Sequence, residues 1–335
     1  MTAISTAPPE AVGAPRTAVD GRRVLQLGLA AVWLLDGVLQ YQSVFFTKAF
    51  GQLLAGAASG NPAVIAGPIT WDAHLVEHYP VLLNAVFATV QLLLGLGIAW
   101  RPTVRVALGA SIAWALAVWW FGEGLGGVLA TPDSAVAGGP GAVVLYALLA
   151  VLLWPADRPV SVPAPFVAAR AVGAPVARAL WLVLWGSMAV IQLLPANRAP
   201  QAAHDDITAM AAGEPRWLAA LVNGTGSLTA HRGLAFSIGL ALVFGLLALA
   251  VYLPAPAVRV TVVAAVVTGL LIWIPGQAFG GILAGGMTDP NSGPLLVLIA
   301  LAYWVPKRVP NRPPEQAPME APVAAPVAGT AEVTA

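Results

Sequence analysis

Glu123 is the residue of this chain that most favours chemistry, because it is a single acid in a glycine-rich, otherwise apolar segment. Glycines flank it at Gly122, Gly124, Gly126 and Gly127. Poor solvation raises the pKa of a carboxyl group unless a cation or backbone donors stabilise the anion. We therefore expect Glu123 to titrate near neutral pH and to couple a proton to ligand binding. The alternative is a structural acid that accepts hydrogen bonds from nearby backbone N–H groups.

A second glycine-rich segment has Gln277 at the position that corresponds to Glu123. Backbone geometry explains the glycines that the two segments share, but it does not explain the charge. The first segment is therefore predicted to hold a proton or a cation, and the second to keep only the shape. Non-helical backbone at membrane depth is tolerated only when it is buried in protein or lines a wet cavity. A tight turn whose small residues let helices approach closely is the alternative.

Asp36 is the only acid within any long apolar segment of the chain, one turn before the outer end of the first segment. Met188 occupies the corresponding position of the second half, so the charge again belongs to the first half. We expect Asp36, with Gln40 and Gln42, to face the same outer vestibule as Glu123. A local cap or a Trp N–H partner is the structural alternative for Asp36.

The histidines suggest two weaker hypotheses. His74 and His78 are four residues apart, on one face if the stretch is helical, as two ligands of one metal ion require. Asp72 and Glu77 are candidate oxygen ligands of the same outer site, and ordinary hydrogen-bonding histidines are the alternative. His78 and His231 also occupy equivalent positions in the two halves, so they could ligate a haem if both rings were buried.

The sequence excludes thiol chemistry and contains no known catalytic or nucleotide-binding motif. The chain has no cysteine, which excludes disulfides and thiol-ligated metals within it. It contains no phosphate loop, dinucleotide fingerprint, nucleophile elbow or zinc-protease motif. The net charge is +1 and the basic residues are scattered, so no nucleic-acid partner is expected.

Membrane helices are expected to position these residues. Of the 335 residues, 59% are hydrophobic and 9% are charged, whereas a soluble domain carries about 25% charged residues. About eight apolar segments predict an all-α, polytopic membrane protein in a lipid bilayer. The segments are 24–40, 81–100, 104–121, 141–154, 179–194, 233–253, 258–275 and 294–305. The excess of Lys and Arg in alternate loops predicts that both termini lie in the cytoplasm.

An internal repeat organises these segments into two units of four helices. Glycines, prolines and tryptophans recur about 154 residues apart, so that Trp119 matches Trp273 and Gly139-Pro140 matches Gly293-Pro294. Four helices per unit give both copies the same orientation, related by a pseudo-twofold axis along the membrane normal. The last segment of each unit, 141–154 and 294–305, is too short to cross a bilayer alone, which favours a site beside it.

The predicted domains follow from this repeat. Residues 24–154 and 179–305 form the two membrane units, and 155–178 form a cytoplasmic linker. The alanine- and proline-rich tails, 1–23 and 306–335, are predicted to be disordered.

The four-helix unit resembles the DoxX/DoxD-like group of small bacterial membrane proteins, which includes a subunit of thiosulfate:quinone oxidoreductase. The resemblance rests on Leu35-Asp36-Gly37, on the amphipathic stretch from Phe46 to Leu54, and on polar and glycine positions between Asn84 and Gly97. It covers residues 24–154 well and 179–305 loosely. This chain differs from the group by carrying two units and by lacking cysteine.

The resemblance implies a redox-associated protein of the bacterial plasma membrane. Such a protein would be a quinone-linked or partner-docking subunit with a membrane or periplasmic redox partner and a small outer ligand site near Asp36 and Glu123. One alternative is a proton-coupled small-molecule transporter that uses Glu123. Another is a structural membrane subunit without chemistry of its own.

Overall fold

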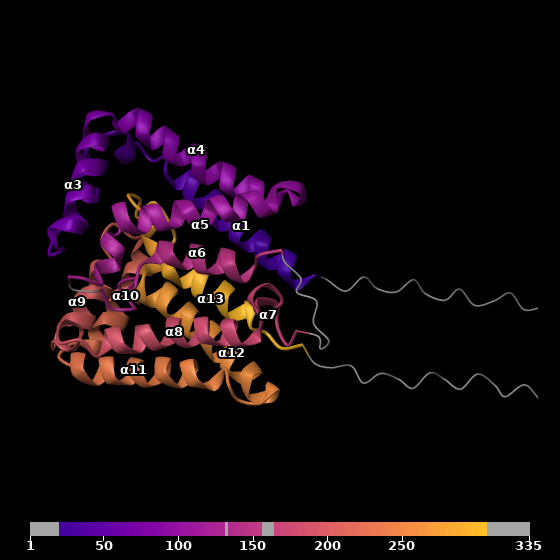
Figure 1. Cartoon of the computed structure of the whole chain (residues 1–335). Coiled ribbons are helices and arrows are strands. Elements are labelled where there is room, and N and C mark those ends of the chain that lie inside the picture. The colour runs from indigo at the N-terminus through magenta and orange to yellow at the C-terminus, as the bar shows by residue number, and fades with distance from the viewer. Residues whose placement is uncertain (1–19, 131–132, 156–163, 307–335) are drawn as a thin grey trace, which may run out of the picture. The chain divides into compact units, whose positions relative to one another are not determined.

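The computed structural model describes residues 20–130, 133–155 and 164–306, which form helices and connecting loops with no strand among them (Figure 1). The helices of the first half are α1 (Gly21–Leu39), α2 (Lys48–Gly56), α3 (Ala63–His78), α4 (Pro80–Ala99), α5 (Val104–Phe121) and α6 (Ala142–Leu152). Those of the second half are α7 (Val167–Val172), α8 (Ala174–Gln192), α9 (Ala202–Ala209), α10 (Arg216–Thr229), α11 (Gly233–Ala250), α12 (Ala255–Leu271) and α13 (Ser292–Ala302). The predicted all-α class is confirmed.

Five helical segments are long and apolar enough to cross a membrane, and they identify a membrane protein. Side chains such as Leu242, Leu246 and Leu249 of α11 are exposed at helical spacing, as expected of a face that contacts lipid. The other three predicted segments are also helices: α6 and α13 have 11 residues each, and α1 carries charged residues. The five segments are Pro80–Ala99, Arg101–Phe121, Ala174–Gln192, Gly233–Ala250 and Ala255–Gly276.

The two halves contain the same order of long helices. Helix α1 packs on α4 and α5 on α6, and in the second half α8 packs on α11 and α12 on α13. Helices α6 and α13 contact each other, and their side chains Leu149, Leu295 and Ile299 are fully buried in the main hydrophobic core (Figure 1). This order is compatible with the internal repeat, which stays a prediction.

Both glycine-rich segments are kinked, as expected from their sequence. Leu125 and Phe279 each have a φ of 57° inside a short 3-10 turn, η3 (Gly124–Gly127) and η6 (Ala278–Gly281). Gly126 follows with a φ of 63°, and a Cβ atom there would lie 2.0 Å from the carbonyl oxygen of Pro140. Only glycine allows this approach of the backbone to the start of α6.

The structure corrects the residue pairing near the end of each half. The Trp119 indole N–H donates to the Pro140 carbonyl at 3.1 Å, and the Trp273 indole N–H donates to the Pro290 carbonyl at 2.9 Å. Within the predicted repeat, these hydrogen bonds pair Pro140 with Pro290 rather than with Pro294. The reason is a connecting loop that is four residues shorter in the second half, which the comparison at a constant spacing misses.

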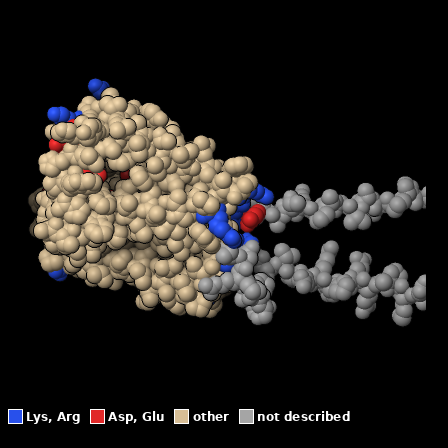
Figure 2. All heavy atoms as spheres, turned by 45° about the horizontal axis from the view of Figure 1, so that its top comes forward, with Lys and Arg blue, Asp and Glu red and all other residues tan. Residues whose placement is uncertain are grey.

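Arginines gather at one end of the bundle, where they bind carbonyl groups at helix ends. Arg23 donates to the carbonyls of Ile98 and Ala99 at the end of α4, and Arg259 donates to the carbonyl of Val305 after α13 at 2.9 Å. Cations are favoured at helix C-termini because the helix dipole is negative there. Figure 2 shows the corresponding cluster of blue atoms at one end of the molecule.

The predicted linker is partly helical. Within residues 155–178, α7 occupies Val167–Val172 and α8 already begins at Ala174. Gly173, with a φ of 86°, separates the two helices. The predicted disorder of residues 1–23 is wrong for residues 21–23, which form the first turn of α1. Residues 1–19 and 307–335 of the predicted tails lie outside the described part of the chain.

Candidate functional site

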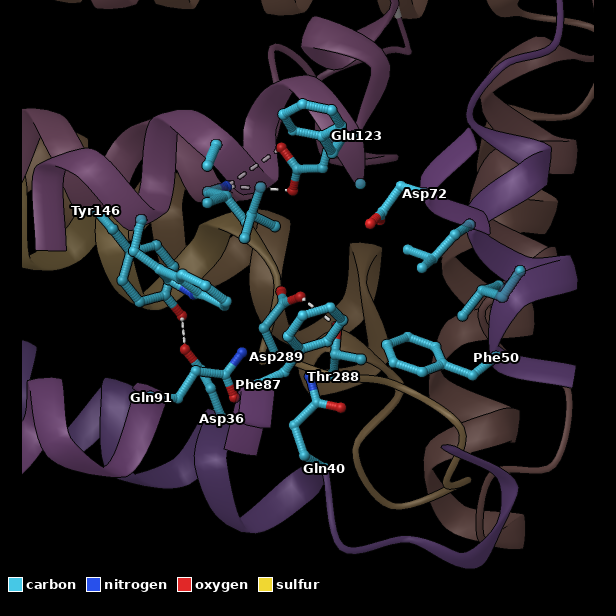
Figure 3. A pocket seen from close by; sticks show the side chains of 18 of the residues that line it. Asp36, Gln40, Phe50, Asp72, Phe87, Gln91, Glu123, Tyr146, Thr288 and Asp289 are labelled. Carbon is cyan, nitrogen blue, oxygen red and sulfur yellow. Dashed lines mark hydrogen bonds between the residues drawn. The ribbon is translucent and has the colours of Figure 1, made fainter. Parts of the chain in front are cut away.

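A cavity of about 370 Å³ lies inside the first half, at the end of the bundle where α1 and α5 finish and α6 begins (Figure 3). This end is opposite to the arginine cluster, because α1 starts at Arg22 and Arg23 and reaches the cavity with Asp36 and Gln40. In Figure 2, red carboxylate atoms border a hollow far from the blue cluster. A volume of this size is within the range of small-molecule sites.

Four carboxyl groups from four different elements line this cavity. They belong to Asp36 of α1, Asp72 of α3, Glu123 after α5, and Asp289 in the loop before α13. Figure 3 shows the side chains of Glu123, Asp72 and Asp289 directed toward a common space. Among the described residues that line the cavity there is no Lys, Arg or His. The site is therefore acidic without an internal counter-charge.

Asp36 is buried, with 2% of its surface exposed, and it is held by one hydrogen bond. The Tyr146 hydroxyl donates to Asp36 Oδ2 at 2.6 Å, while Oδ1 has no hydrogen-bond partner among the described residues. The Trp33 ring packs on Tyr146 with centroids 4.3 Å apart, and the Trp33 N–H donates to Ser111 Oγ. The hydrogen-bond donor to Asp36 is therefore Tyr146, and not a Trp N–H as in the structural alternative.

Glu123 has the features of both roles predicted from the sequence, a structural acid bound to backbone N–H groups and a proton-exchanging acid. Its carboxylate accepts hydrogen bonds from the backbone N–H of Val143, at 3.2 and 3.4 Å, in the first turn of α6. The same carboxylate lines the cavity, and burial together with the nearby Asp289 raises the pKa of Glu123 to about 8. The backbone donors oppose this rise in pKa because they stabilise the anion. Glu123 can therefore be structurally anchored and still exchange a proton near neutral pH.

Gly141 makes room for the Glu123 carboxylate. Its φ of 109° is unfavourable for other residues, and a Cβ atom there would lie 2.5 Å from Glu123 Oε2 and 2.8 Å from the Trp119 indole nitrogen. The glycine thus lets the carboxylate reach the N-terminus of α6. The second half has Asn291 at this point, and its side chain instead accepts from the Ser292 N–H at 2.6 Å.

Two amides in the cavity wall have oxygen atoms without a hydrogen-bond partner among the described residues. Gln40 and Gln91 are 3% and 7% exposed, and the Oε1 atoms of both lack a hydrogen-bond partner within the described residues. The indole N–H of Trp114, also in the cavity wall, is a buried donor in the same situation. Buried polar groups are normally paired, so a ligand or water is expected to bind these atoms.

A loop of the second half closes one side of the cavity. The Gln42 side chain donates to the Met287 carbonyl at 3.1 Å and accepts from the Gly286 N–H. This clamp brings Thr288 and Asp289 against the first half (Figure 3). Burial raises the pKa of Asp289, and hydrogen bonds from Asn291 N–H and the Thr288 hydroxyl oppose that rise.

The matching space of the second half is filled with side chains. Met188 and Phe244, which the predicted repeat pairs with Asp36 and Gln91, are buried in the main core. Leu296 stands where the first half has Tyr146, counted from the matched prolines Pro140 and Pro290, and it is also buried. Gln277 is fully buried and donates to Ser292 Oγ at 2.9 Å.

The histidine hypotheses gain no geometric support. In the described part of the chain, no group of three or more His, Asp or Glu side chains is arranged to hold a metal ion. His74 lies 3.7 Å from Glu77 with a largely exposed side chain, whereas Asp72 lines the cavity. His78 and His231 are both exposed, although haem ligation would require both rings to be buried.

The glycines named with Glu123 shape the backbone and supply no side chain. Gly122 lines the cavity, while Gly124, Gly126 and Gly127 belong to the kinked turn η3. Tyr146, Gln91 and Asp289 were not identified as site residues from the sequence. Tyr146 and Gln91 could have been found as polar groups within apolar helices. Asp289 is distant along the chain from the other acids of the site, and nothing in its local sequence marks it.

No protein-family model, curated protein or solved structure matches this chain. The DoxX/DoxD-like resemblance therefore stays a prediction.

Proposed function

We propose that this protein is a membrane protein that binds a small organic molecule in the cavity between Asp36 and Glu123 in exchange for a proton, as a proton-coupled carrier does. The observation that supports this proposal best is the set of four carboxyl groups in one cavity without a basic side chain in its described lining. Intramembrane acids are costly and mark proton or substrate pathways in transporters. Glu123 is the proton-exchanging group of this proposal, and Asp36 is a ligand-binding group.

The proposed topology has eight membrane spans, as two parallel four-helix units, with both termini in the cytoplasm of a bacterial cell. The arginine cluster at the end opposite to the cavity supports this orientation, because cytoplasmic loops are enriched in Lys and Arg. The cavity would then open toward the outer side. Helices α6 and α13 would cross the bilayer together with the kinked segments that precede them.

A quinone-linked redox subunit remains the second hypothesis, from the sequence resemblance alone. A quinone presents carbonyl acceptors and needs donors in its site. Three of the four unpartnered buried polar atoms in the wall, on Asp36, Gln40 and Gln91, are acceptors. The geometry therefore favours the carrier over the quinone-linked subunit.

The proposal is tested in proteoliposomes that contain a pH-sensitive dye and receive a panel of small cationic, neutral and anionic compounds. We expect at least one compound to drive proton movement through the wild type, and this movement to be lost in Glu123→Gln. Gln at this position copies Gln277, so the variant should still fold. Proton movement that is equal in both proteins would contradict the role of Glu123.

A further inference from the structure

We infer that the ligand of this cavity is a small organic cation, namely a protonated amine on an aromatic or branched apolar body. This inference rests on the proposed function, since it names the ligand class of the same cavity. Two independent observations carry it: the unpaired acceptor atoms of residues in the cavity wall and the aromatic rings of the same wall.

The acceptor atoms demand a ligand that donates hydrogen bonds. Asp36 Oδ1, Gln40 Oε1 and Gln91 Oε1 are buried oxygens of residues that line the cavity, and they have no partner among the described residues. An ammonium group carries three N–H donors and no acceptor. Its three donors match three acceptor oxygens in number, whereas a neutral alcohol donates only one hydrogen bond.

The charge of the ligand follows from the four carboxyl groups. Asp36, Asp72, Glu123 and Asp289 come from separate elements, and the described cavity wall offers them no Lys, Arg or His. A buried carboxylate without a cation is costly, so a bound cation offsets its desolvation. An anionic ligand would add to the repulsion.

Aromatic rings form the apolar part of the wall. Phe87 packs edge-on against Phe50 and at a similar angle against Trp114, with ring centroids 6.2 and 5.7 Å apart. Trp33 and Tyr146 stand beside the Asp36 carboxylate. Aromatic faces attract organic cations, and they also pack against an apolar ligand body. The wall is therefore suited to an amine with one ring.

Binding of the cation should release a proton. Glu123 faces Asp72 from α3, Asp36 from α1, Tyr146 from α6 and Asp289 from the second-half loop, with Asp133 also near enough to act on it. A cation among these groups stabilises the Glu123 anion, so the carboxyl proton is lost to solvent when the cation enters. One positive charge enters and one leaves, and the charge of the site is conserved.

The test uses three probes with the same body: phenethylammonium, phenethyl alcohol and phenylacetate. Each is titrated into the purified full-length protein in lipid nanodiscs, and binding is followed by the change in total tryptophan fluorescence and by calorimetry. We expect the cation to bind at least about tenfold more tightly than the alcohol, and the anion not to bind. Equal or tighter binding of the alcohol or the anion would overturn the cation assignment and leave the proposed cavity standing.

Variants test whether the negative charge of the cavity or only its shape binds the ligand. Asp36→Asn should weaken phenethylammonium about tenfold or more while changing phenethyl alcohol little, because only the cation uses the charge. Asp205→Asn, an exposed acid on α9, is the matched control and should change neither. Equal losses for both probes in Asp36→Asn would assign Asp36 to shape and overturn the ion pair. If none of the three probes binds, both this inference and the proposed function fail.

Discussion

The Tyr146 hydroxyl donates to only one of the two carboxylate oxygens of Asp36, at 2.6 Å, and the other oxygen is buried without a described partner, in a residue that lines the cavity. The pair joins α1 to α6, and Trp33 packs on the tyrosine ring. This arrangement fixes the orientation of the carboxylate while leaving one oxygen free. A buried carboxylate oxygen without a hydrogen bond is unfavourable. We therefore expect a ligand to donate a hydrogen bond to this oxygen.

Tyr146→Phe should therefore destabilise the protein. It removes a buried hydrogen bond to an acid, which contributes about 1–3 kcal/mol to the free energy of unfolding. Tyr252→Phe, at an exposed position, is the control and should change this free energy by less than about 0.5 kcal/mol. Denaturant unfolding in detergent micelles measures both. A Tyr146→Phe protein as stable as the control would show that the hydrogen bond does not hold Asp36.

Glu123 should make stability depend on pH. Its pKa is raised from 4.5 to about 8, so the folded state retains a proton that the unfolded state loses. Stability is then highest below about 4.5 and falls as the pH rises toward about 8, above which it is level again. In Glu123→Gln this decline should be smaller than in the wild type. Thermal unfolding between pH 5 and pH 9, in steps of about half a unit, compares the two; parallel curves would refute the raised pKa.

The Gly141 position should not tolerate a side chain. Gly141→Ala places a Cβ atom against Glu123 and Trp119 at a φ of 109°, and we expect a loss of about 2–3 kcal/mol or more in the free energy of unfolding. Gly186→Ala is the matched control, because it lies within α8 with open space around its Cβ position. That control should be neutral or stabilising by up to about 1 kcal/mol. Similar behaviour of both variants would contradict the described contact.

The Gln42 clamp should control the loop that carries Asp289. Gln42→Ala removes the side-chain acceptor of the Gly286 N–H and the donor to the Met287 carbonyl. Hydrogen exchange of the Gly286 amide should become about tenfold faster or more, the equivalent of one lost hydrogen bond of about 1 kcal/mol. Gln52→Ala, on the exposed side of α2, is the control. Unchanged exchange at Gly286 would mean that the loop is held by other contacts.

The sequence predicts the helices and two of the four acids of the site, for identifiable reasons. Long apolar segments specify membrane helices, and Asp36 and Glu123 stand out because each is an isolated acid in apolar surroundings. Tyr146 is less conspicuous, because tyrosine is common in apolar helices. Asp289 becomes part of the site only through the Gln42 clamp, a tertiary contact between segments that are distant along the chain.

The predictions of a histidine metal site and of a linker over 155–178 show what the sequence does not determine. The spacing of His74 and His78 is compatible with a metal site, but α3 turns Asp72 toward the cavity and leaves His74 exposed. Spacing along a helix fixes which residues share a face, and it does not fix what that face packs against. In the same way, the proline-rich composition of 155–178 does not reveal that Pro175 lies in the first turn of α8, where proline is well tolerated.

The central claim is that binding in this cavity exchanges a proton at Glu123, and calorimetry tests it most directly. Phenethylammonium is titrated into wild type and Glu123→Gln at pH 7 in two buffers with different ionisation enthalpies, which gives the number of protons released. The account predicts release of about one proton from the wild type and close to none from Glu123→Gln. Binding without proton release in the wild type, or equal release from both proteins, would contradict it.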